Sequence, residues 1–418
     1  MKYHFIGIAG SSMSGLALVM RKMGHKITGC DLNLKKHSTV HITKDLDAIV
    51  ITSAITPGTA AWEEVEKAKE YHIPVIKRSK IIGRLMQEKK GIAIAGTHGK
   101  TTTSAMIVKI LQKAKKDPTF FLGGEIPRYG NAGLGKGEYL VAEACEYERQ
   151  FLDFRPKIAV ITNIEVEHPD TYPGGIKEIK VAFKKFVKLL PKNGILVLNQ
   201  DDKLSSYLKK VAKCKVKSFS FQKSWPGLHL KIPGKHNVAN ATAAARVCHE
   251  IGVPSKTIKE VLNNFTGAKR RFEIKGEKKD VLIVDDYAHH PTEIKATLKG
   301  AREFYPKRRI ICVFQPHQYL RTEAFFDEFA QAFGDCDKLI LTEIYSVAGR
   351  EPKQKKFNSQ DLAEEIAKKS QSNVAFIKDY NQIVDLLCKN VRQNDLIITM
   401  GATKIYEVGE KLLSCLSN

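Results

Sequence analysis

The chain has 418 residues, which is too many for a single hydrophobic core, so two or three domains are expected. Hydrophobic residues make up 43% of it, which is typical of globular proteins, and no apolar run is long enough to cross a bilayer. The formal net charge of +23 raises the question of nucleic-acid binding, but the lysines are dispersed and no basic arm is present. A lysine-rich proteome or an anionic phosphate substrate explains the charge at least as well.

The eight cysteines are scattered and form no C-x-x-C pair. This usage predicts reduced thiols in a cytoplasmic protein and argues against a zinc site. The N-terminus runs directly into an apolar strand and a glycine loop, so no signal peptide is expected.

Residues 1 to about 88 have the pattern of a nucleotide-binding α/β unit. An apolar strand at 3–8 leads into a glycine loop, and an apolar helix begins at Leu16. A second strand at 26–30 closes on Asp31, and a later strand at 48–51 ends close to Ser53. Alternating strands and helices predict a parallel sheet whose ligands lie at the carboxyl ends of its strands. The loop departs from G-x-G-x-x-G, so an ordinary βα turn is the alternative.

A second glycine loop follows the apolar strand at 92–95 and precedes a helix; its sequence is Gly96-Thr97-His98-Gly99-Lys100-Thr101-Thr102. Glycines allow a tight turn that aims backbone N–H groups at a phosphate, and the helix N-terminus adds positive potential. Lys100 would reach the outer phosphates, and the Thr101 hydroxyl would hold a magnesium ion. The usual phosphate-loop pattern requires a glycine where Ile94 stands, so a glycine turn that merely carries a lysine is the alternative.

Two further strands of this second unit, which spans about 89–267, end in acidic residues. The strand at 138–144 ends at Glu143, and the strand at 157–164 is followed by Glu165, Glu167 and His168. Strands of one parallel sheet present their carboxyl ends together, so these side chains are expected beside the phosphate loop.

An alanine-rich helix late in the second unit carries Asn237 and Asn240, which lie three residues apart on one face. Amide side chains can contact an adenine edge. Helix capping by Asn237 is the alternative.

The third unit, from about 268 to the end, again has a doubly wound pattern. A strand at 281–286 ends in two acids and is followed by Tyr287, His289 and His290. The next strand, at 309–314, ends before Gln315-Pro316-His317, with Arg321 just beyond. Adjacent histidines rarely face one ion, so substrate contact is favoured over metal binding.

These motifs together resemble the Mur ligase family over essentially the whole chain, and most closely its alanine-adding branch. The resemblance rests on the phosphate loop and on the following pieces: Gly7-Ile8-Ala9-Gly10 with Met13-Ser14-Gly15, Glu143-Ala144, Thr162-Asn163-Ile164-Glu165 with His168, Pro233-Gly234 with His236-Asn237 and Asn240, Arg270-Arg271-Phe272, Asp285-Asp286-Tyr287 with His289-His290-Pro291-Thr292-Glu293, and Gln315-Pro316-His317.

The resemblance implies an α/β protein of three domains. These are a Rossmann-like domain for the UDP part of UDP-N-acetylmuramate at 1–88, a central parallel sheet of the P-loop ATPase type at 89–267, and a Rossmann-like amino-acid domain at 268–418. It also implies an ATP-dependent ligase of peptidoglycan precursor synthesis, in which an acyl phosphate of the substrate carboxylate is attacked by the amine of L-alanine. Closure of the third domain is expected to exclude water.

The same resemblance implies roles for individual residues. Lys100, Glu143 and His168 would be catalytic, and Thr101, Glu143 and His168 would hold Mg²⁺. The ATP contacts implied are Gly96, Thr97, His98, Gly99, Lys100, Thr101, Thr102, Asn237, Asn240, Arg271 and Asp286. The UDP-substrate contacts implied are Gly7, Gly10, Ser11, Ser12, Met13, Ser14, Gly15, Asp31 and Ser53. The amino-acid contacts implied are Tyr287, His289, His290, His317 and Arg321.

Several positions depart from the family pattern: Ala9 and Ser12 replace glycines, Cys145 and Glu167 replace aspartates, and Gln318 replaces an arginine of the alanine-adding branch. A ligase that attaches a recycled peptide to UDP-N-acetylmuramate is therefore a close alternative. An ATP-binding scaffold without activity and a basic nucleic-acid binder are the alternatives from other classes. A monomer or homodimer without nucleic acid or a membrane span is expected.

Overall fold

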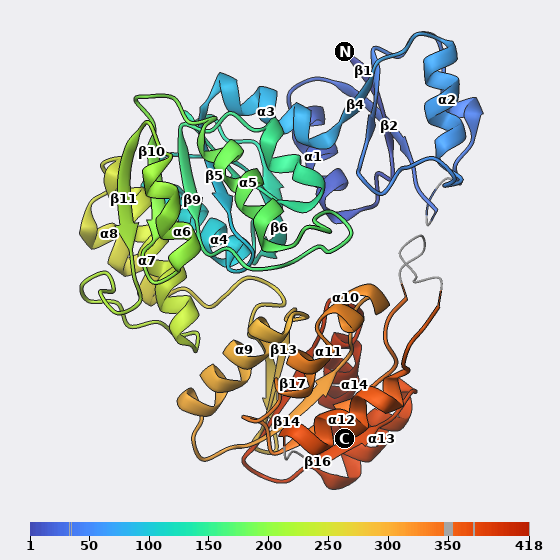
Figure 1. The fold of residues 1–418 in the computed structure, drawn as a ribbon, viewed down its shortest axis with the longest axis vertical. Coiled ribbons are helices and arrows are strands. Elements are labelled where there is room, and N and C mark those ends of the chain that lie inside the picture. The colour runs from blue at the N-terminus through green and yellow to red at the C-terminus, as the bar shows by residue number, and fades with distance from the viewer. Residues whose placement is uncertain (33, 35, 347–353, 371–372, 418) are drawn as a thin grey trace. The chain divides into compact units, whose positions relative to one another are not determined.

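The computed structural model describes residues 1–32, 34, 36–346, 354–370 and 373–417. It contains three sheets, each flanked by helices (Figure 1). The chain divides into two compact units, one of Met1–Leu228 with Ala239–Asn263, and one of His229–Val238 with the chain from Asn264 onward. No helix among the described residues is both long and apolar enough to span a membrane.

The first sheet has four parallel strands in the order β2-β1-β3-β4. Its strands are β1 (Lys2–Ile6), β2 (Lys26–Cys30), β3 (Ala48–Ile51) and β4 (Val75–Lys77). Its helices are α1 (Ser11–Lys22), η1 (Thr39–His41), α2 (Trp62–Glu70) and α3 (Arg78–Glu88). The order places the loops after β1, β2 and β3 at one edge, where the sequence predicted ligand contacts.

The second sheet has seven strands in the order β11-β10-β9-β5-β8-β6-β7, with β7 antiparallel to β6 and the other pairs parallel. Its strands are β5 (Lys90–Ala95), β6 (Thr119–Ile126), β7 (Gly130–Gly133), β8 (Tyr139–Glu143), β9 (Ile158–Ile161), β10 (Ile195–Asn199) and β11 (Lys215–Phe219). Its helices are α4 (Lys100–Lys113), η2 (Tyr147–Asp153), α5 (Ile176–Val187), α6 (Lys203–Tyr207), η3 (Leu208–Lys210), α7 (Lys235–Glu250) and α8 (Ser255–Asn263). The sequence alone gave no assignment for 203–230, where β11 lies.

The first two sheets share one continuous core, which explains why they form one compact unit. Leu16 of α1, Phe151 of η2 and Leu196 of β10 belong to the same buried cluster. Helix α3 also meets η2 closely, since a Cβ at Gly83 would lie 2.2 Å from the carbonyl oxygen of Asp153. Glycine at this position therefore allows the backbones to approach.

The third sheet has six strands in the order β12-β13-β17-β14-β15-β16, of which only β12 is antiparallel within the described residues. Its strands are β12 (Glu273–Lys278), β13 (Val281–Asp286), β14 (Arg309–Phe314), β15 (Lys338–Leu341), β16 (Asn373–Phe376) and β17 (Asp395–Met400). Its helices are α9 (Pro291–Phe304), α10 (Tyr319–Ala324), α11 (Phe326–Ala330), α12 (Ser359–Ser370), α13 (Tyr380–Asn390) and α14 (Tyr406–Ser417). Separate apolar clusters cover its two faces.

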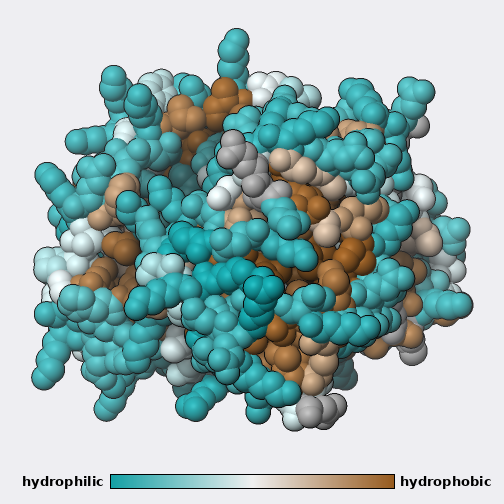
Figure 2. Space-filling view, turned by 90° about the horizontal axis from the view of Figure 1, so that it is seen from below, coloured by the Kyte–Doolittle hydropathy of each residue, from teal (hydrophilic) through white to brown (hydrophobic). Residues whose placement is uncertain are grey.

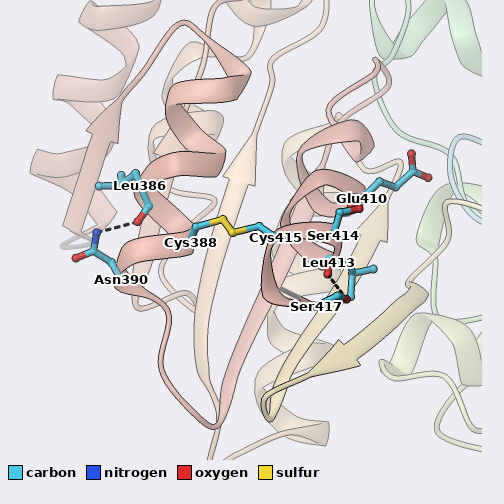
Figure 3. Close-up of a disulfide and its surroundings, with 8 residues drawn as sticks. All are labelled: Leu386, Cys388, Asn390, Glu410, Leu413, Ser414, Cys415 and Ser417. Atoms are coloured by element: carbon cyan, nitrogen blue, oxygen red, sulfur yellow. Dashed lines mark hydrogen bonds between the residues drawn. A yellow bond between two sulfur atoms is a disulfide. The ribbon is translucent and has the colours of Figure 1, made fainter.

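Two cysteines of the third sheet's helices form a disulfide, which the sequence did not predict. Cys388 of α13 is bonded to Cys415 of α14, with their Cα atoms 6.5 Å apart (Figure 3). The expectation that all eight cysteines are reduced is therefore wrong for this pair, because the packing of α13 on α14 brings together residues 27 positions apart. The other six cysteines form no disulfide in the described part of the chain.

Polar residues cover much of the surface (Figure 2). In a space-filling view of one face, hydrophilic residues predominate and apolar residues gather in separate patches (Figure 2).

Candidate active site

The phosphate loop between β5 and α4 needs glycine at two positions. Gly96 has φ +127° and Gly99 has φ +82°, values that side chains rarely adopt. A Cβ at Gly96 would also lie 2.0 Å from Thr162 Oγ1, and one at Gly99 would lie 2.4 Å from Asn240 Oδ1. Glycine at both positions therefore allows the loop to lie directly against the end of β9 and helix α7.

The loop is also fixed by hydrogen bonds to Asn163, the second residue after β9. The N–H of Thr97 donates to the Asn163 carbonyl at 3.0 Å, and the N–H of His98 donates to its side-chain oxygen at 2.9 Å. His98 Nε2 lies 3.5 Å from a carboxylate oxygen of Glu165. The loop is thus bonded to residues that follow β9, and Glu165 lies beside it, as the sequence predicted from strand order.

Lys100 lies in this loop with its amine buried among oxygens. Its Nζ donates to the Thr97 carbonyl at 2.9 Å, to a Glu146 carboxylate oxygen at 3.0 Å, and to the Gly96 carbonyl. Burial lowers the pKa of Lys100, but Glu146, Cys145 and Glu143 together raise it more, so the pKa lies above its usual value. Lys100 therefore carries its positive charge at the mouth of the loop at neutral pH.

Glu146 is a site residue that the sequence analysis missed. The Glu146 side chain is buried, and its carboxylate forms an ion pair with Lys100. One oxygen of this carboxylate lies 3.8 Å from Nε2 of His168. The backbone carbonyl of Glu146 accepts a 2.6 Å hydrogen bond from the Tyr172 hydroxyl. Glu146 lies three residues after Glu143, just beyond the end of β8, and this position could have marked it as a site residue in the sequence.

Thr101 and Glu143 lie together, as predicted. The Thr101 hydroxyl donates to one Glu143 carboxylate oxygen at 3.0 Å, and the N–H of Gly123 donates to the other at 2.6 Å. Hydroxyl and carboxylate oxygens are the ligands that Mg²⁺ prefers. The donor chemistry of this pair therefore fits a magnesium ion.

His168 approaches the same edge from the loop after β9. Its ring packs against Tyr147 with centroids 4.9 Å apart, and its Nε2 faces Glu146. The structure thus places His168 beside the Lys100–Glu146 pair. Its assignment to the metal stays a prediction.

The two asparagines of α7 have different surroundings. Asn240 lies against Gly99 of the phosphate loop. The side-chain amide of Asn237 donates to the Pro233 carbonyl at 2.7 Å, a local bond at the start of the helix. This is the kind of structural role that the sequence left open for Asn237, whereas Asn240 touches the site.

The first glycine loop, after β1, is tied to the end of β2. The N–H groups of Gly7 and Ile8 donate to the Cys30 carbonyl at 2.9 and 3.1 Å. The N–H of Ala9 donates to the Asp31 carboxylate at 3.2 Å. Asp31 therefore lies directly at the loop, as the parallel sheet predicted.

The predicted UDP-substrate residues of helix α1 divide into exposed and packed ones. Ser11 and Ser12 are exposed at its N-terminus, next to Gly10. Met13 is fully buried in the core, and a Cβ at Gly15 would lie 2.8 Å from Ala132 of β7. The Met13 side chain therefore has no exposed atom to offer a ligand, a burial that the motif alone did not reveal.

Three hydrogen bonds from two side chains connect this edge to the second sheet. Asn131 Nδ2 donates to the carbonyl of Ser11 at 2.7 Å and to its hydroxyl at 3.0 Å. Gln150 Nε2 donates to the Ser53 hydroxyl at 3.1 Å. Asn131 and Gln150 lie outside the recognised motifs, so they could not be found from the sequence.

In the third sheet, basic residues surround the acidic end of β13. Arg270 donates to Asp285 at 2.9 Å and to the Gly401 carbonyl at 2.7 Å. Asp286 accepts the N–H groups of Phe272 at 2.7 Å and Ala288 at 2.8 Å.

The pKa of Asp286 departs strongly from its ordinary value. Burial raises it to about 6, although Arg271 and the backbone hydrogen bonds lower it. The guanidinium of Arg271 lies 5.0 Å from the ring centroid of Tyr287. The structure thus gathers Arg271, Asp286 and Tyr287 at one strand end. The roles that the resemblance implies for them, nucleotide contact for Arg271 and Asp286 and amino-acid contact for Tyr287, stay predictions.

The predicted amino-acid residues follow β13 and β14. The rings of His289 and His317 lie 6.3 Å apart, and His317 stacks on Tyr345 at 5.6 Å. Arg321 donates to Nδ1 of His317 at 3.2 Å and to its carbonyl at 3.1 Å, so in this structure it positions His317.

His290 and Gln318 have clear local roles. His290 is the N-cap of α9, where its Nδ1 accepts from the N–H of Thr292 at 3.3 Å, and its ring packs on Phe325. Gln318 stands at the N-cap of α10 with φ 74°, and its N–H donates to the Tyr345 carbonyl at 2.9 Å.

A pocket beside His317 contains residues that the sequence analysis did not assign. Gln315 accepts from the Tyr380 hydroxyl at 2.6 Å and from the Thr403 hydroxyl. Arg270 and Tyr406 also line this pocket.

Comparison with known proteins identifies the family. Three family models match in order: Mur ligase family, catalytic domain, at residues 2–90; Mur ligase middle domain at 94–226; and Mur ligase, glutamate ligase domain, at 270–403. The UDP-N-acetylmuramate–L-alanine ligase of Caldanaerobacter subterraneus subsp. tengcongensis is 41% identical and covers 99% of this chain and 97% of its own length. That of Sulfurihydrogenibium sp. is 40% identical, with coverage of 100% and 98%.

Solved structures agree with the sequence comparison. The crystal structure of the UDP-N-acetylmuramate–alanine ligase of Thermotoga maritima superimposes with a TM-score of 0.81 at 27% identity, covering 99% of this chain and 98% of that one. The murein peptide ligase of Psychrobacter arcticus shares the fold, with a TM-score of 0.71 at 24% identity and coverage of 100% and 99%.

The fold and the phosphate-loop site define an ATP-dependent ligase that forms an amide bond. The chain belongs to the Mur ligase family. The resemblance drawn from the sequence and the three-domain α/β fold are both confirmed.

Proposed function

We propose that this protein joins L-alanine to the carboxylate of UDP-N-acetylmuramate at the expense of ATP, in peptidoglycan precursor synthesis. The relatives described above, which match over nearly their full length, are named for this activity, and the first of them is 41% identical to this chain. The structural observation that carries the proposal is the partly buried, charged Lys100 in a glycine loop beside Thr101 and Glu143. Such a loop binds the phosphates of a nucleotide and stabilises charge on a transferred phosphoryl group.

In the proposed reaction the carboxylate oxygen attacks the γ-phosphorus of ATP, which releases ADP and leaves an acyl phosphate. The amine of L-alanine then attacks the acyl carbon, the C–O bond to phosphate breaks, and the amine loses a proton. Lys100 would neutralise the phosphoryl oxygens, and Asn240 would contact the adenine. The exposed Ser11 and Ser12, with Asp31 and Ser53, would bind the UDP part.

Thr101 and Glu143 would hold Mg²⁺, with His168 as a candidate for a second ion. The ion would offset the repulsion among the phosphate and carboxylate oxygens. His289, His317, Tyr287 and Arg321 would serve the amino-acid end. We also propose that the protein acts in the cytoplasm, where these nucleotide substrates occur.

The test is phosphate release from ATP with UDP-N-acetylmuramate and a panel of single amino acids and the recycled tripeptide. Release with L-alanine, with glycine and L-serine weaker, is expected. Release with the tripeptide alone would assign the chain to peptide recycling, and Gln318 would then be the residue to exchange for arginine. Binding of MgATP without any release would contradict a ligase and favour a scaffold. Binding of mixed DNA at low salt would support the nucleic-acid alternative.

A further inference from the structure

Five side chains with metal-binding atoms meet at one side of the first sheet, away from the phosphate loop. We name them the His–Cys–Glu cluster: His4 of β1, Cys30 at the end of β2, His37, His41 of η1 and Glu64 of α2. None of the five was predicted as a site residue. They come from β1, from the end of β2, from the segment 37–41 that follows it and from α2, so the fold brings them together.

The donor atoms of the cluster are close and enclosed. One ligand atom from each of His4, Cys30, His41 and Glu64 lies within 4.8 Å of all the others. Glu64 and Cys30 are fully buried, and Cys30 Sγ lies 3.1 Å from Glu64 Oε2. His41 Nδ1 lies 3.0 Å from Glu64 Oε1. A tetrahedral zinc site places its ligand atoms roughly 3.3–3.7 Å apart, given bonds of about 2.0–2.3 Å. Small side-chain shifts would therefore suffice.

Neighbouring residues hold the side chains of the cluster in place through hydrogen bonds. Nδ1 of His4 lies 2.9 Å from the Thr28 hydroxyl, which fixes the ring and assigns Nε2 to the ion. Ligating histidines are commonly held in this way through their second nitrogen. The N–H of Ser38 donates to Glu64 Oε1 at 3.1 Å, and His37 Nδ1 lies 3.1 Å from Glu64 Oε2.

A metal-free hydrogen-bond network is the competing explanation. Burial raises the pKa of Glu64, but hydrogen bonds from Cys30, Ser38 and the histidines lower it below its ordinary value. Burial and the Glu64 carboxylate raise the pKa of the Cys30 thiol. A buried carboxylate with so many donors is satisfied without an ion. However, one thiol, two imidazoles and one carboxylate also form the donor set of a zinc site.

We propose that His4, Cys30, His41 and Glu64 bind Zn²⁺, with Thr28, His37 and Ser38 orienting the ligands. On binding, the Cys30 thiol gives up its proton to solvent and the thiolate bonds to the ion. The ion joins β1, β2, η1 and α2, and so fixes the segment that follows β2. This proposal does not depend on the proposed ligase function.

The test is metal analysis of full-length protein purified without an affinity tag, after exposure to Zn²⁺ and dialysis. We expect about one Zn²⁺ per chain in the unchanged protein and in Cys312→Ser, a matched control in which a buried thiol of the third sheet is replaced. Cys30→Ser and Glu64→Gln should retain less than about a tenth of that. Chelation should lower the Tm of the unchanged protein and leave that of Cys30→Ser unaltered.

Cobalt provides a second measurement that needs no folded variant. Co²⁺ bound to the unchanged protein should give a thiolate-to-metal charge-transfer band, which alkylation of thiols in unfolded protein abolishes. Zinc content below about a tenth per chain together with no such band would overturn the proposal and leave the hydrogen-bond network. Equal zinc in the unchanged protein and a folded Cys30→Ser variant would also overturn it.

Discussion

The two glycine loops of the first compact unit look alike in sequence but differ in what their glycines do. In the phosphate loop, a Cβ at Gly96 would meet Thr162 Oγ1 at 2.0 Å and the backbone nitrogen of Thr162 at 2.9 Å. In the first loop, Gly7 has φ +81°, yet a Cβ there would have nothing within 4 Å. The phosphate loop therefore requires glycine for space and conformation, and the first loop requires it for conformation alone.

This difference shows where a motif carries information. A loop packed against its neighbours allows little variation, and Gly96 and Gly99 both lie where a side chain would collide. The first loop is open, and it carries Ala9 and Ser12 in place of glycines. An open loop can change its side chains without a steric conflict.

The largest effect should come from removing the charge of the phosphate loop. Lys100→Ala is expected to lower kcat by about a hundred-fold or more, because the loss of one group that stabilises charge in the transition state typically has an effect of this size. Steady-state phosphate release measures it. Lys113→Ala, at the exposed end of the same helix, is the control. Retention of more than about a tenth of the activity by Lys100→Ala would sink the assignment of the loop.

Two buried carboxylates extend the comparison to the third sheet. Glu146 is paired with Lys100, whereas burial raises the pKa of Asp286 to about 6. A raised folded-state pKa means that the stability from this group is fully present below pH 4 and is lost as the pH rises through 6. Relative to Asp286→Asn, the free energy of unfolding should fall by up to about 3 kcal/mol between pH 4 and 7. Chemical denaturation measures this, and parallel pH profiles would contradict it.

A matched pair of substitutions compares the loops directly. Gly96→Ala should cost more than the roughly 1–2 kcal/mol expected of a strained backbone alone and should raise the KM for ATP. Gly7→Ala should cost only about that amount and should affect the KM for the UDP substrate. Thermal unfolding and steady-state kinetics report both. Equal losses of stability would show that the crowding of Gly96 has no consequence.

The smallest expected effect concerns the amino-acid end. Arg321→Ala should raise the KM for L-alanine by about ten-fold, or about 1.4 kcal/mol, with less change in the KM for ATP. The physical reason is that Arg321 positions His317 through two hydrogen bonds. Arg321→Lys keeps the charge and serves as the control. A weakened KM for ATP with an unchanged KM for alanine would place Arg321 elsewhere.

The sequence predicted the features that follow from strand order. Lys100, Glu143 and His168 follow or end parallel strands of one sheet, so they lie at the same edge of that sheet whatever they contact. Their positions could therefore be predicted without a structure. Glu146, Asn131 and Gln150 could not, because their partners depend on how loops and helices pack. The same limit applies to the Cys388–Cys415 disulfide. It applies also to the His–Cys–Glu cluster, in which His4 and Glu64 are distant in sequence from Cys30, His37 and His41. Met13 matched the motif of the first glycine loop, and only the fold shows that its side chain is buried in the hydrophobic core.

The central claim is that the phosphate-loop edge transfers a phosphoryl group from ATP to a carboxylate. The most direct measurement supplies UDP-N-acetylmuramate labelled with ¹⁸O in its carboxylate, together with ATP and L-alanine, and follows the label by ³¹P NMR. An acyl phosphate predicts that one labelled oxygen leaves with inorganic phosphate as the amide forms. Label in AMP, or unlabelled phosphate alongside the amide, would contradict the account.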